Sequence, residues 1–74
     1  MLIADRFMHN GHIFVACVGD DISRDFACTS IHVDGSTYKV KAFEARNSFS
    51  DRMQALLEIE GTQLPPLGEC TIMN

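Results

Sequence analysis

The sequence predicts an all-β protein, a small closed or partly open barrel of five or six antiparallel strands. Two turn signals, Asn10-Gly11 and Asp34-Gly35, each lie between strand-like runs, and such dipeptides favour two-residue hairpins because they accept positive φ angles. The chain has 74 residues, enough for a single domain spanning 1–74 and a thin core. Closing the sheet would hide its edges, so we expect a barrel.

The first hairpin is expected to join strands at Leu2–His9 and His12–Val18 through Asn10-Gly11. The second run, His-Ile-Phe-Val-Ala-Cys-Val, is mostly apolar rather than alternating. This pattern indicates a strand that is covered on both faces or that curves through a closed barrel. A polar connection follows, in which we expect Ile22 and Phe26 to point inward.

The central hairpin turns at Asp34-Gly35, and its two strands alternate in polarity. A period of two places alternate residues on opposite faces of a sheet, with the apolar face inward. The positions expected to face inward are Thr29, Ile31, Val33, Tyr38, Val40 and Ala42, and those expected outward are Ser30, His32, Lys39 and Lys41.

The segment from Met53 to Glu60 fits either a strand or a helix, because it alternates well but has high helix propensity. We favour a strand, since Gly61 would limit a helix to little over two turns. Leu56 interrupts the polar face of that strand. The composition of 46–51 predicts a loop, the Pro65-Pro66 segment predicts another, and Glu69–Met73 reads as a last strand.

The charge and hydropathy of the chain limit its functions. The net charge of −4 gives no support to nucleic-acid binding, which requires cations to neutralise phosphates. No run approaches the roughly 20 apolar residues that cross a bilayer, and charges follow too soon after Met1 for a secretory signal. We therefore expect a cytoplasmic protein without membrane contact.

The three cysteines at positions 17, 28 and 70 are odd in number and widely spaced. No Cys-x-x-Cys pair occurs, so neither a zinc ribbon nor a thioredoxin-like motif is indicated. Free cysteine behaves as a small buried hydrophobe, and we expect all three to be buried, reduced thiols.

Four motifs follow one another along the chain: Asp5–Gly11, Val15–Val18, the central hairpin, and Leu67–Ile72, which enters its strand through a glycine. In order and spacing, these motifs resemble the second-domain β-barrel of elongation factor Tu and related translation factors. The resemblance implies a barrel that serves as an accessory domain. No Gly-x-x-x-x-Gly-Lys-Ser/Thr loop occurs in the chain, so the resemblance does not extend to the GTPase part.

Three groups of side chains are candidates for a site. His9 and His12 would face each other across the first turn, as two weak metal ligands that need a third or simply as a solvated tip. Lys39 and Lys41 could meet an acidic partner or an RNA backbone, or only discourage strand pairing. Phe49, in a polar loop, could cap the barrel or, with Leu56, mark an apolar binding patch.

No motif in the sequence indicates a catalytic residue or a cofactor. We therefore expect a non-enzymatic interaction module, a free-standing translation-factor-like barrel whose partner is a protein or a ribonucleoprotein. A homodimer is an alternative to the monomer, because a small barrel can leave an edge and apolar groups uncovered. The alternative function is a small metal-binding or catalytic protein that uses His9 and His12.

Overall fold

The structure is a computed structural model that describes residues 1–47 and 53–74. It confirms the all-β prediction: the described residues form one antiparallel sheet, nearly closed into a barrel, and no helix. The strands are β1 (Leu2–His9), β2 (His12–Val18), β3 (Ser30–Val33), β4 (Ser36–Asn47), β5 (Met53–Ile59), β6 (Gly68–Glu69) and β7 (Thr71–Met73).

The strand order β6-β1-β2-β5-β4-β3-β7 brings the two ends of the sheet together. The edge strands β6 and β7 are separated in the chain by Cys70 alone. The expected last strand is thus broken at one residue: β6 pairs with β1, and β7 pairs with β3. The sheet therefore has seven strands rather than five or six, and the bend at Cys70 nearly closes it.

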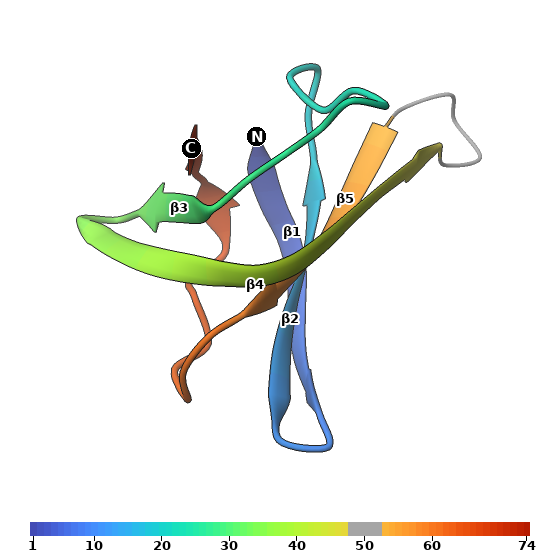
Figure 1. Ribbon diagram of the computed structural model, residues 1–74. Helices are drawn as coiled ribbons and strands as arrows, with labels where there is room; N and C mark the ends of the chain where they lie inside the picture. Colours follow the sequence, from blue (N-terminus) through green and yellow to red (C-terminus); the bar gives the residue numbers. More distant parts are fainter. Residues whose placement is uncertain (48–52) are drawn as a thin grey trace.

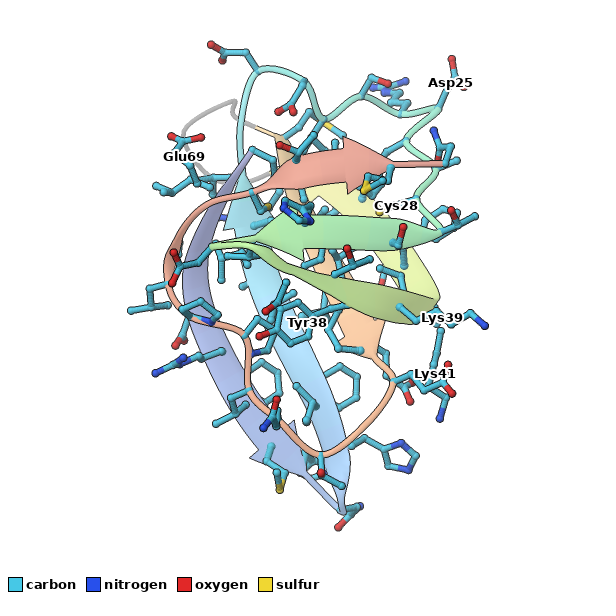
Figure 2. All side chains as sticks on the ribbon, turned by 90° about the vertical axis from the view of Figure 1, so that its left-hand side faces the viewer. Asp25, Cys28, Tyr38, Lys39, Lys41 and Glu69 are labelled. Atoms are coloured by element: carbon cyan, nitrogen blue, oxygen red, sulfur yellow. The ribbon has the colours of Figure 1, made fainter. Side chains whose placement is uncertain are left out.

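Strand β4 belongs to both halves of the barrel (Figure 1). Its first residues, Ser36–Lys39, pair with β3, and Val40–Asn47 pair with β5. Seen from the side, the strands β7, β3 and the start of β4 run across β1 and β2 (Figure 2). The core lies between these two crossing layers.

Both predicted hairpin turns have the expected backbone. Asn10 and Gly11 have φ angles of 50° and 78°, and Asp34 and Gly35 have 49° and 82°. Positive φ at both central positions is typical of the type I′ turn, whose twist matches that of the flanking strands. The segment Met53–Ile59 is a strand, which confirms the prediction of a strand rather than a helix there.

A β-bulge in β4 overturns one predicted side-chain orientation. Val40 pairs with Ile59 but Ala42 pairs with Glu58, so Lys41 is an extra residue between them. One inserted residue reverses the alternation that follows it. Ala42 therefore faces outward and is exposed. Phe43 instead lies on the inner side, opposite the buried Leu57, although 45% of its surface is exposed.

Thr29, which we also expected to face inward, is exposed. It precedes β3, and its hydroxyl donates a hydrogen bond to the backbone oxygen of Met73. The alternation that we read from the sequence begins one residue later, at Ser30.

The core is built from the inner residues of both layers together with the connection between β2 and β3. Ile22 and Phe26 are buried, as predicted, and the Phe26 ring packs edge-to-face on Phe43 at 5.8 Å. This connection therefore packs against the inner side of β4. The buried apolar residues are Ile3, Ile13, Val15, Cys17, Ile22, Phe26, Cys28, Ile31, Val33, Ala55, Leu57, Ile59 and Cys70.

Candidate functional site

The outer side of β1, β2 and β5 carries apolar side chains where a sheet facing water is usually polar. Ile13, Val15 and Cys17 of β2 are buried, so the alternate residues face outward. The register places outward residues of β1 and β5 beside them. We call this surface the outer apolar face; its residues are Leu2, Phe7, Phe14, Ala16, Val18 and Leu56.

Aromatic stacking holds one end of the outer apolar face. Phe7 and Phe14 are directly opposed across β1 and β2, and their rings stack at 5.3 Å with an interplanar angle of 19°. Phe7 still exposes 43% of its surface and Leu2 exposes 39%. Contiguous exposed apolar groups of this kind mark interaction sites more often than isolated ones do.

The middle of the outer apolar face is a row that crosses four strands. Ala16 pairs with Asp5 on one side and with Leu56 on the other, and Leu56 pairs in turn with Glu44. The row therefore has an apolar centre and a carboxylate at each end. Leu56, singled out in the sequence because it breaks a polar pattern, lies within this centre.

A polar network borders the face beside Phe14. Glu58 pairs with Phe14 in the register, and its Oε2 accepts a hydrogen bond from His12 Nδ1 at 2.9 Å and lies 3.4 Å from Lys41 Nζ. The hydrogen bond from His12, followed by that from Lys41, holds the pKa of Glu58 below its ordinary value. Glu58 thus stays ionised, and its charge is compensated within the chain.

The two candidate lysines have different surroundings, although both point outward (Figure 2). Lys41 lies in the β4 bulge and pairs with Glu58. Lys39 lies on the other layer, opposite Ser30 of β3. Because Lys41 is compensated by a carboxylate, the two lysines offer a weak electrostatic attraction to phosphate.

His9 and His12 are directly opposed across the first turn, in the register that the turn predicts. Their rings have different partners: Asn10 Nδ2 donates to His9 Nε2 at 3.3 Å, whereas His12 contacts Glu58. Within residues 1–47 and 53–74, no three His, Cys, Asp or Glu side chains gather as a ligand set. The pair would need a ligand from elsewhere to hold a zinc ion.

The three cysteines are free and buried, as predicted. Interaction with the Cys70 thiol, together with burial, raises the pKa of the Cys17 thiol, and the same interaction lowers the pKa of Cys70. Burial raises the pKa of Cys28. The labelled Cys28 lies at the level of β3 and β7 in Figure 2. The thiols are therefore part of the core and not of the outer apolar face.

Phe49 lies outside the described residues. Sequence reasoning missed Phe7, Phe14, Ala16 and Val18 as surface residues. A signal was present, since the run from His12 to Val18 is apolar on both faces. We interpreted it as a strand that is covered on both faces or that curves through a closed barrel. The structure agrees with the second interpretation: β2 belongs to the nearly closed barrel, one of its sides faces the core, and Phe14, Ala16 and Val18 on the other side are half-buried.

Comparisons of the chain with protein-family models, with curated proteins and with solved structures found no match. Among the residues that the structure describes, no helix has the length and apolar character needed to cross a membrane.

Proposed function

We propose that this chain is a non-enzymatic interaction module, a translation-factor-like β-barrel that binds a protein partner through the outer apolar face. The observation that carries the proposal is the apolar content of β2 on both of its sides. The side chains of Phe14, Ala16 and Val18 face away from the core and do not contribute to its packing. They form a continuous surface with Phe7 and Leu56. A partner that covers this surface would complete the burial of β2.

The charge of the chain favours a protein over RNA. The net charge is −4, and one of the two candidate lysines, Lys41, is paired with Glu58. The outer apolar face also has the aromatic content that protein interfaces favour. The resemblance of the chain to an accessory barrel of translation factors also fits a binding role, although a similar fold does not by itself establish an activity.

The proposal is tested by affinity capture from cytosol with three forms of the protein. These are the wild type, Leu56→Glu in the centre of the outer apolar face, and Thr71→Glu as a control. Thr71 is exposed on β7 and pairs with β3, in the other layer of the barrel. We expect a protein, identified by mass spectrometry, that wild type and Thr71→Glu retain and that Leu56→Glu loses. Equal capture by all three forms would contradict the proposal.

A metal-binding role remains the alternative, and the cross-strand pairing of His9 with His12 is the observation that favours it. Elemental analysis of protein purified without a histidine tag distinguishes the two functions. Stoichiometric zinc, nickel, iron or copper that is lost in His9→Ala would support the alternative. Substoichiometric metal that is unchanged in that variant would remove it.

A further inference from the structure

We propose that the partner presents an amphipathic helix to the outer apolar face, with an apolar stripe flanked on both sides by lysine or arginine. This inference rests on the proposed function and specifies the chemistry of the partner. It follows from the dimensions of the face, from the charges at its two ends, and from the repulsion that a second copy of the chain would meet.

The width of the face fits one helix. The central row runs from Asp5 on β1 through Ala16 and Leu56 to Glu44 on β4. Three strand spacings separate its ends, or about 14 Å. A helix with its side chains is roughly 10–12 Å in diameter. A helix lying along the strands would thus cover the apolar centre and bring its two flanks near the two carboxylates.

The length of the face fits two to three helical turns. Phe14 and Val18 lie four residues apart on β2, which corresponds to about 13 Å along the strand. A helix advances about 5.4 Å per turn, so side chains at i, i+4 and i+7 would meet Phe14, Ala16 and Val18 in succession. Helices that bind through one apolar face use anchors with this spacing.

The carboxylates at the ends of the row are available to cations of a partner. The side chain of Asp5 accepts a hydrogen bond from the backbone of Arg6 at 2.8 Å, and among the described ion pairs it contacts no cation. Glu44 lies 3.6 Å from Arg46, and both side chains are more than 60% exposed. Such an exposed pair is weak and exchanges readily.

The same charges disfavour a second copy of this chain as the occupant. When two identical faces stack with their strands aligned, the row of one copy lies over the row of the other. A two-fold axis along the strands places Asp5 over Glu44 of the second copy, and an axis across the strands places each carboxylate over its own equivalent. In both arrangements, carboxylates of the two copies face each other at both ends of the row. Like charges that face each other across an interface are destabilising.

Two synthetic helices serve as probes. Both carry leucine at i, i+3, i+4 and i+7; one has lysine on its flanks and the other has glutamate. Binding to isotope-labelled protein is followed by NMR titration at low salt. We expect the lysine-flanked helix to bind about three- to tenfold more tightly, with amide shifts along β1, β2 and β5. Higher salt should reduce the difference, because exposed charges are screened.

Variants of the two carboxylates test the recognition. Asp5→Asn with Glu44→Gln keeps the shape of both side chains, and the Asn side-chain oxygen can still accept the hydrogen bond from Arg6. We expect this double variant to bind both helices equally. The charge-reversed pair Asp5→Lys with Glu44→Lys should prefer the glutamate-flanked helix. Dispersed NMR spectra of each variant show that it folds, and Thr71→Glu should behave as wild type.

Three outcomes would overturn the inference. In the first, wild type binds both helices equally and Leu56→Glu abolishes the binding; this result would support the proposed function but refute the recognition of cationic flanks. A mass near twice 8.2 kDa in light scattering, lowered by Leu56→Glu, would make a second copy the occupant. If neither helix binds and affinity capture also finds no partner sensitive to Leu56→Glu, both this inference and the proposed function fail.

Discussion

Replacing Gly35 tests whether the backbone of the central turn, and not the space around it, requires glycine. Gly35 has a φ of +82°, and a Cβ added at this position would meet no atom within 4 Å. Any cost of substitution is therefore conformational. A β-branched residue at positive φ costs about 1–3 kcal/mol, whereas asparagine adopts this region readily.

The expected order of stability is Gly35→Asn, then Gly35→Ala, then Gly35→Val as the least stable. In a domain of this size, 1 kcal/mol shifts the melting temperature by roughly 4–8 °C. Gly35→Val should thus melt about 4–24 °C below wild type, as measured by circular dichroism. If the valine and asparagine variants melt at the same temperature, the turn does not hold a positive φ in solution and the reasoning is wrong.

Three further predictions follow from the core, the thiols and the Glu58 network. Leu57 is fully buried in β5, so Leu57→Ala should lower the free energy of unfolding by about 2–5 kcal/mol in urea titration; a change below 1 kcal/mol, roughly that of a surface site, would contradict its core position. Because the interaction between the Cys17 and Cys70 thiols lowers the pKa of Cys70 and raises that of Cys17, a thiol reagent should label Cys70 before Cys17 in native protein, and both far faster in denaturant; labelling of Cys17 before Cys70 would refute this order. Lys41→Met removes one of the two groups that lower the pKa of Glu58, so NMR titration should show that pKa rising toward its ordinary value. A carboxyl group whose pKa is lowered by folding stabilises the fold at pH values above its ordinary pKa, and this stabilisation is lost as the pH falls through the folded-state pKa. The Lys41→Met variant should therefore lose less stability than wild type on acidification. An unchanged pKa of Glu58 would exclude a contribution from Lys41.

Local signals in the sequence were sufficient for the hairpins. The pairs Asn10-Gly11 and Asp34-Gly35 determine both the position and the type of their turns, because few other residues accept positive φ at two successive positions. The strand at Met53 also followed from local information, since Gly61 leaves little room for a helix. These features depend on neighbours in the chain and on backbone sterics.

Features that depend on pairing between distant strands could not be predicted. The bulge at Lys41 arises where β4 leaves β3 and joins β5, and no turn residue marks it. The outer apolar face needs the register of three strands, because Ala16 and Leu56 become neighbours only when β2 pairs with β5. The break in the polar pattern identified Leu56 from the sequence, but its neighbour Ala16 could be identified only from the strand pairing.

The break at Cys70 has a consequence for the order in which the barrel folds. The hairpins β1–β2 and β3–β4 join residues that are close in the chain, and such units form within about 10 μs. Closure instead pairs Glu69 with Leu2 and Met73 with Ser30, contacts of high sequence separation that slow folding toward milliseconds or longer. Until that last segment docks, the edges of β1 and β3 are open, and this interval is when the nascent sheet is most exposed to pairing with other chains.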